Sequence, residues 1–184
     1  MRLGKFGVFA IAALLAGTAE LSGAAQSAVV RSDVRTRQLE YEIGAALLRL
    51  PYYDVFDSLA YEVAGKGLVR LSGQVRTGWL KNDAERAVKR VRGVDTVIND
   101  IEILPPSLGD DRIRLAVYRS LFADSSLYRY ALGANPSIRI IVKNGRVTLE
   151  GLVNSPMDKT MAGFKAREVW GVFGVTNNLV VEKS

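Results

Sequence analysis

A near-duplicate pair of segments constrains the fold of this chain more than any other feature. Gly145–Val153 repeats Gly67–Val75 at an offset of 78 positions, the difference between 145 and 67. In both segments apolar residues alternate and a glycine holds the same place, a pattern typical of a strand that bends at the glycine. The match continues at the same offset from Gly93–Ile103 to Gly171–Val181, without an insertion. We therefore expect two copies of one domain rather than one larger core.

Each copy shows the same order of predicted elements, which is helix, strand, strand, helix, strand. In the first copy we expect a helix at 32–50, a hairpin at 59–75, a helix at 84–91 and a strand at 97–103. The second copy predicts a helix capped by Asp110 or Asp111, a hairpin at 138–153, a helix at 156–170 and a strand at 175–181. Asn144-Gly145 favours a tight primed turn, and the first copy needs one extra residue there. The predicted fold class is α+β: two tandem αββαβ domains, each a three-stranded mixed sheet with two helices packed on it.

The domain boundaries follow from the repeat and from two prolines. We expect a signal peptide at 1–28, a first domain at 32–104, a Pro-rich linker at 105–109 and a second domain at 110–184. Arg2 and Lys5 precede an apolar run and then small residues, which predicts cleavage near 24–28. The alternative is that this segment stays attached as an anchor. Export predicts a periplasmic location, and the absence of cysteine excludes a cysteine-linked lipoprotein.

Composition excludes several kinds of chemistry. The chain contains no Cys and no His, which rules out a thiolate nucleophile, a Ser-His-Asp triad, a disulfide and a histidine or cysteine metal site. No motif gathers the remaining carboxylates, so we predict no enzyme activity, no metal and no cofactor. The net charge of +6 is carried mainly by the second copy, which an anionic partner would meet more readily. Acidic residues dilute the basic cluster at 86–92, so we predict no nucleic-acid partner.

The residue spacing that the two copies share resembles that of the BON family (bacterial OsmY and nodulation). The resemblance is carried by Val-x-Leu-x-Gly-x-Val after a turn glycine, and by Gly-Val-x-x-Val-x-Asn-x-Leu-x-Val after the second helix. The first copy departs at the turn and at Ile101, where the pattern has leucine. The resemblance implies a secreted or periplasmic location, paired domains, roles in envelope or osmotic stress, interaction with phospholipid, and no catalytic residues.

The register between the copies also identifies positions where they differ. Four large apolar residues of the second copy align with charged residues of the first: Met161 with Asp83, Phe164 with Arg86, Trp170 with Arg92, and Phe173 with Asp95. At about 100° per residue, Ala162 and Ala166 face the core, and Phe164 lies nearly opposite with Arg167 beside it. Lys159 and Lys165 flank the helix. By contrast, Asn99 and Asn177 share strand parity with apolar neighbours, so we expect structural amides there.

We predict that this side of the second copy is a binding surface. Its candidate residues are Phe164, Arg167, Met161, Trp170, Phe173, Lys159 and Lys165. Aromatic side chains bordered by bases are typical of contact with an anionic phospholipid membrane surface. The alternatives are that the same side contacts an envelope protein, as in an interaction or chaperone-like module, or packs on the first copy or on another subunit of a homo-oligomer.

Overall fold

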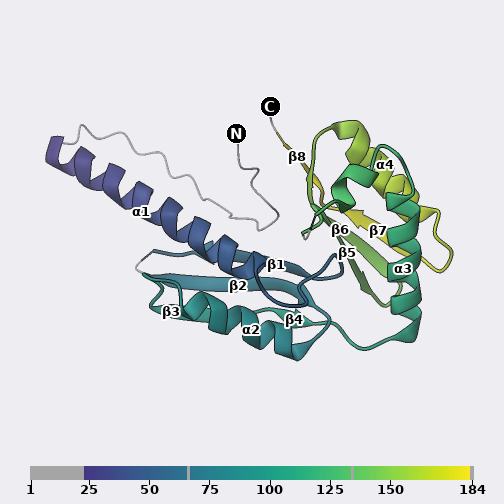
Figure 1. The fold of residues 1–184 in the computed structure, drawn as a ribbon, viewed down its shortest axis with the longest axis horizontal. Coiled ribbons are helices and arrows are strands. Elements are labelled where there is room, and N and C mark those ends of the chain that lie inside the picture. The colour runs from purple at the N-terminus through teal and green to yellow at the C-terminus, as the bar shows by residue number, and fades with distance from the viewer. Residues whose placement is uncertain (1–22, 66, 134, 183–184) are drawn as a thin grey trace.

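The computed structural model describes residues 23–65, 67–133 and 135–182, with side chains from residue 34 onward. The predicted signal peptide lies outside the described residues as far as residue 22, and the expected cleavage region at 24–28 is helical backbone. The chain forms two α+β units in tandem, which lie beside one another (Figure 1). The predicted fold class and the order of elements in each copy are therefore confirmed.

The first unit is a mixed sheet with two helices on one face. Its elements are α1 (Gly23–Leu48), β1 (Ser58–Val63), β2 (Leu68–Val75), α2 (Gly78–Lys89), β3 (Thr96–Asn99) and β4 (Glu102–Ile103). β1 is antiparallel to β2, and β3 and β4 pair with β2 in parallel, as one strand in two pieces. The core joins alternate residues of β1 and β2 to buried residues of both helices, including Ile43, Leu47, Ala84 and Val88.

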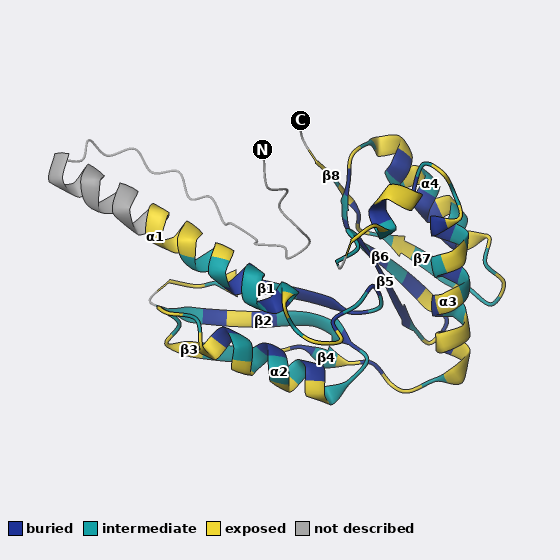
Figure 2. Cartoon of the chain, viewed as in Figure 1, coloured by how far each residue is buried: buried dark blue, intermediate teal, exposed yellow. Residues whose placement is uncertain are grey.

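The second unit repeats this arrangement. Its elements are α3 (Leu108–Phe122), a short 3-10 helix η1 (Tyr128–Ala131), β5 (Ile138–Lys143), β6 (Arg146–Val153), α4 (Pro156–Arg167), β7 (Gly174–Asn177) and β8 (Val180–Val181). β5 is antiparallel to β6, whereas β7 and β8 are parallel to it. Buried residues gather in the strands and on the inner helix faces of both units, and exposed residues lie on the outer helix faces (Figure 2).

One glycine in each copy is required by close backbone contact. Gly73 and Gly151 have φ values of 115° and 122°, which L side chains rarely adopt. A Cβ on Gly73 would lie 2.2 Å from the Ser58 carbonyl oxygen, and one on Gly151 would lie 1.9 Å from that of Ser137. The shared glycine of the repeat is therefore a feature of the fold that lets the first two strands of each unit pair.

The hairpin turns and the two asparagines agree with the sequence predictions. Val63 pairs with Val69 in the first unit and Val142 with Val147 in the second, so the first turn contains one more residue. Asn144 and Gly145 have φ values of 52° and 72°, as a primed turn requires. The Asn99 and Asn177 side-chain amides donate to the Lys81 and Lys159 carbonyls at 3.1 and 2.7 Å, which gives both asparagines a structural role.

Three predicted helix starts are wrong. α2 begins at Gly78 instead of at residue 84. α1 begins at Gly23 instead of near Ser32, because the alanine-rich residues upstream are good helix formers. α3 is capped by Ser107, whose hydroxyl accepts from the Asp110 amide at 3.2 Å, and neither Asp110 nor Asp111 is the cap. The Asp110 carboxylate is instead buried and accepts from the Asn144 and Gly145 amides at 2.9 and 2.8 Å. This acid therefore fastens the β5–β6 turn to α3.

The segment 53–57, which we call the strap, joins the two units. The Ile140 amide on the edge strand β5 donates to the Val55 carbonyl at 2.8 Å, and the Val55 side chain belongs to the core of the second unit. The buried Arg139 donates to the Asp54 carbonyl at 2.7 Å, and its guanidinium lies 4.3 Å from the centre of the Tyr53 ring. Because the strap takes part in the second core, the units are fixed relative to one another.

Candidate functional site

Helix α4 presents the predicted surface, and its sequence explains where it begins and which side it buries. Ser155 caps it by accepting from the Asp158 amide at 3.0 Å, and Pro156 occupies its first turn, where no amide donor is required. Ala162, Gly163 and Ala166 are buried against the sheet. These small residues let the helix lie close to β7, since a Cβ on Gly163 would come within 2.8 Å of the Asn177 amide nitrogen. The larger side chains of α4 therefore lie on its outer side.

Several large apolar side chains of the second unit are open to solvent. Phe164 is 57% exposed, Phe173 is 79% exposed and Trp170 is 95% exposed. Met157, which the sequence analysis did not select, is 76% exposed at the start of α4. Large exposed apolar side chains that gather on one part of a protein commonly mark interaction sites. The second unit thus carries such residues both along α4 and beyond its end.

The structure divides the predicted surface into two parts. Phe164 and Met157 lie on the outer side of α4, seven residues apart and so on the same helical stripe. Trp170 and Phe173 follow the helix and form what we call the tip. The Phe173 amide donates to the Gly145 carbonyl at 2.9 Å, and a Cβ on Gly145 would lie 2.4 Å from the Phe173 ring. The tip is therefore held against the β5–β6 turn that Asp110 supports.

Met161 and the three predicted bases differ in how far their side chains are free to contact a partner at the surface. Met161 is half-buried and packs against the core of the second unit, so it adds little to the outer surface. Arg167 is exposed, and Lys159 is half-buried. Lys165 lies 3.6 Å from the Asp124 carboxylate, whose pKa is held below its usual range by hydrogen bonds from Ser126 and by this lysine. The positive charge of Lys165 is therefore partly neutralised by the Asp124 carboxylate.

Arg146 is a further base that the sequence analysis did not find. It is exposed at the start of β6, and its guanidinium lies 3.4 Å from a Cβ built on Gly174, the residue after Phe173. The pairing of Arg146 with Gly174 in the β6–β7 register places it beside the tip. No local sequence signal identifies Arg146, because only the parallel pairing of β6 with β7 brings it to the tip.

The buried carboxylates already have structural partners. Asp110 binds the turn, Asp158 accepts from the Tyr130 hydroxyl at 2.6 Å, and Asp57 accepts from the Arg76 amide at 2.8 Å. Burial raises the pKa of Asp57 above its ordinary value. Among the residues that the structure describes, no cluster of three or more acidic side chains could hold a metal ion. The exposed apolar and basic surface therefore remains the candidate site.

Two αββαβ units in tandem, one of them with an exposed apolar surface bordered by bases, define a two-domain α+β repeat protein. The family model for the BON domain matches residues 37–105 and 109–183. The chain therefore belongs to the BON domain family, which indicates a phospholipid-binding or envelope-associated module. Proteins of this family are typically periplasmic or membrane-associated. In the described part of the chain, no helix has both the length and the apolar character needed to cross a bilayer.

Comparison with solved structures finds two of CdsD, a structural protein of the type III secretion system of Chlamydia trachomatis. One, its C-terminal domain, is 11% identical, covers 78% of this chain and 96% of that chain, and has a TM-score of 0.27. The other is 12% identical, covers 80% of this chain and 93% of that chain, and has a TM-score of 0.29. No curated protein matches the chain.

Proposed function

We propose that the chain is an exported, non-catalytic binding protein that associates with anionic phospholipid membranes through its second unit, in a periplasmic role connected with envelope or osmotic stress. The observation that carries this proposal is the near-complete exposure of Trp170 and Phe173. The first unit has Arg92 and Asp95 at these positions, so the fold itself does not require aromatic residues there. Trp rings favour the boundary between lipid and water.

Charge and geometry support lipid as the partner. Arg146 and Arg167 are exposed around the tip and the outer side of α4. Near an anionic leaflet each base contributes about 1 kcal/mol, and a partly inserted aromatic contributes about 2 kcal/mol. Two aromatics and two bases then supply about 6 kcal/mol, which corresponds to a Kd of tens of micromolar. We therefore expect reversible binding that strengthens where several molecules gather on one membrane.

Vesicle sedimentation tests the proposal. The full chain, purified without its predicted signal peptide, should sediment with anionic vesicles and remain in solution with zwitterionic ones. Phe164→Asp combined with Arg167→Glu should weaken this binding about tenfold or more without unfolding the protein. Tyr41→Asp combined with Arg37→Glu is the matched control, because both residues are exposed on α1 of the first unit and the pair makes the net charge more negative by the same amount.

The results separate the candidate functions. Binding of the folded double variant equal to that of the wild type would remove Phe164 and Arg167 from the site. Absence of binding by the wild type to any vesicle would overturn the lipid proposal and favour the interaction or chaperone-like module. In that case the same exposed residues would contact an envelope protein, which cross-linking from residue 164 in the periplasm would identify.

A further inference from the structure

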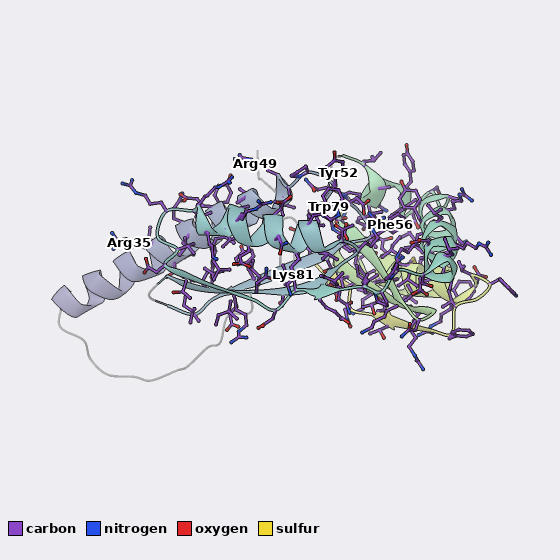
Figure 3. All side chains as sticks on the ribbon, turned by 90° about the horizontal axis from the view of Figure 1, so that it is seen from below. Arg35, Arg49, Tyr52, Phe56, Trp79 and Lys81 are labelled. Carbon is purple, nitrogen blue, oxygen red and sulfur yellow. The ribbon has the colours of Figure 1, made fainter. Side chains whose placement is uncertain are left out.

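The first unit carries an exposed apolar patch of its own, made of Tyr52, Trp79 and Ile103, which we call the first-unit patch. Tyr52 is 72% exposed, Trp79 is 51% exposed and Ile103 is 49% exposed. The Tyr52 and Trp79 ring centres lie 5.0 Å apart with an interplanar angle of 51°. The Ile103 Cδ1 lies 3.3 Å from a Cβ built on Gly78, the neighbour of Trp79. Figure 3 shows Tyr52 and Trp79 together at the start of α2.

Comparison with the second unit shows that the fold does not require this patch. At the same offset of 78, Trp79 corresponds to Met157 and Ile103 to Val181, and Val181 is half-buried against its own core. The second unit thus has no aromatic pair at the start of α4. The two units therefore carry aromatic surfaces at opposite ends of their second helices.

The backbone of Tyr52 provides a second argument. Its φ of 63° lies in the left-handed region, where a residue other than glycine costs about 1 kcal/mol or more. A glycine would satisfy this turn without that cost. The chain instead holds a tyrosine whose ring is mostly in solvent and otherwise rests on Trp79. Such a strained and exposed aromatic residue is more simply explained by a contact outside the molecule than by the fold.

The charges around the patch favour an anionic partner. Lys81 lies three residues after Gly78, on the helix side that faces Ile103, whereas Arg49 lines a groove with Ala87 near the other end of α2. Lys81 makes no ion pair among the described residues, whereas the nearby acids Asp54 and Glu102 are paired with Arg76 and Lys143. No acidic residue lies in the first turn of α2. The acids at the border are therefore matched by bases, and Lys81 leaves a small positive excess.

The positive charge at the border of the first-unit patch disfavours a second copy of this chain as its binding partner. The exposed apolar surface at α4 and the tip belongs to the second unit, which carries a net charge of about +4 and presents Arg146 and Arg167. Docking one surface on the other would bring bases together. A Trp-Tyr pair with a positive border instead matches the interface of an anionic bilayer, where both ring types are enriched.

We propose that the first-unit patch is a second contact with anionic phospholipid, so that the protein has one lipid contact on each unit. This inference rests on the proposed function, because it assigns the same ligand to a different surface. The strap keeps the spacing between the two contacts constant. Two weak contacts held at a fixed spacing give stronger overall binding than either alone when one membrane engages both.

The two tryptophans of the chain allow each contact to be followed separately. Trp170→Phe leaves Trp79 as the reporter of the first-unit patch, and Trp79→Phe leaves Trp170 as the reporter of the tip. Each full-length variant is titrated with anionic vesicles that contain brominated acyl chains. We expect both emissions to shift to the blue and to be quenched by bromine, with less of both effects at high salt.

The possible outcomes distinguish the two proposals. Quenching of Trp170 without quenching of Trp79 would overturn this inference and leave the proposed function intact. Quenching of Trp79 alone would uphold the first-unit contact and overturn the tip assignment, and quenching of neither would overturn both. A blue shift of Trp79 that depends on protein concentration without lipid would show self-association and would also overturn the inference.

Tyr52→Gly separates a binding role from a structural one. In the Trp79 reporter background we expect it to weaken lipid binding about thirtyfold, the effect of losing one partly inserted aromatic ring. The thermal midpoint should not fall, because glycine adopts the positive φ without strain. A lowered midpoint with unchanged lipid binding would assign Tyr52 to the fold and count against the patch.

Discussion

The two units of this protein share a fold but differ in where they expose apolar residues. The first exposes Tyr52 and Trp79 where its second helix begins, and the second exposes Trp170 and Phe173 where its second helix has ended. By contrast, the backbone contacts that hold each unit together internally are the same in both. The Asn99 and Asn177 amides bind equivalent carbonyls, and Gly73 and Gly151 have almost equal φ values. The comparison indicates that differences between the copies identify candidate contact surfaces, whereas agreements identify the scaffold.

The largest expected effect tests the shared scaffold. Gly151→Ala places a Cβ within 1.9 Å of the Ser137 carbonyl oxygen at a φ of 122°, so it should lower the free energy of unfolding by about 4 kcal/mol. Gly73→Ala should be nearly as damaging, because its Cβ would lie 2.2 Å from the Ser58 carbonyl oxygen. Urea unfolding followed by circular dichroism measures both.

Gly133→Ala is the control for that pair. Its φ is also positive, at 91°, but apart from its chain neighbours no described residue has an atom within 4 Å of the added Cβ. It should cost only the backbone strain, about 1 kcal/mol. If Gly151→Ala costs no more than this control, the close contact with Ser137 does not constrain the fold.

The next largest expected effect on stability compares two buried tyrosines, one in each unit. In the second unit, the Tyr130 hydroxyl donates to Asp158 at 2.6 Å and accepts from the Asn154 amide at 2.8 Å. Tyr130→Phe leaves both partners unsatisfied and should cost about 2 kcal/mol. Tyr53 is equally buried in the first unit, but its hydroxyl has no hydrogen-bond partner among the described residues. Tyr53→Phe should therefore be neutral or slightly stabilising, and equal losses in the two variants would contradict this difference.

The smallest effect concerns alkaline pH and Tyr61, a tyrosine that only the first unit has at its position in the hairpin. Burial raises the pKa of Tyr61 from 10.0 to about 12, whereas the second unit has Ile140 at the corresponding place in the hairpin. A folded-state pKa above the unfolded value gives stability that is complete below pH 10 and is lost as the pH rises toward 12. The loss should reach about 1 kcal/mol per pH unit in this window.

Tyr61→Phe isolates this contribution. The variant gives up the hydrogen bond from the Tyr61 hydroxyl to the Glu40 carbonyl, but its unfolding free energy should fall less steeply above pH 10 than that of the wild type. Urea unfolding at several pH values from 9 to 11 measures the two slopes. Parallel slopes would show that Tyr61 does not titrate differently on unfolding.

The sequence predicted the parts of the fold that depend on local pattern. Alternating apolar residues defined both hairpins, Asn144-Gly145 defined the turn of the second, and the constant offset of 78 related the two units. It did not predict the role of Asp110, because the amides of Asn144 and Gly145 that this acid binds are far away in the chain. For the same reason it missed the strap, in which Val55 of one unit completes the core of the other.

The candidate surface was predicted only in part. Helical angles placed Phe164 on the outer side of α4, but they did not show that Met161 packs on the core or that Lys165 lies near Asp124. Arg146 was missed because it is brought to the tip by strand pairing. Tyr52 and Trp79 were missed because the copies were compared only for apolar residues gained by the second.

The most direct test of the central claim exchanges the tip residues for those of the first unit. Trp170→Arg combined with Phe173→Asp introduces the residues found at Arg92 and Asp95 and leaves the net charge unchanged. Because charge is conserved, a loss of binding would report lost apolar contact alone. We predict that affinity for anionic vesicles falls by close to a thousandfold, because two rings of about 2 kcal/mol each are lost, while the thermal midpoint stays the same. Unchanged affinity in the folded variant would contradict the assignment of the tip as a lipid contact.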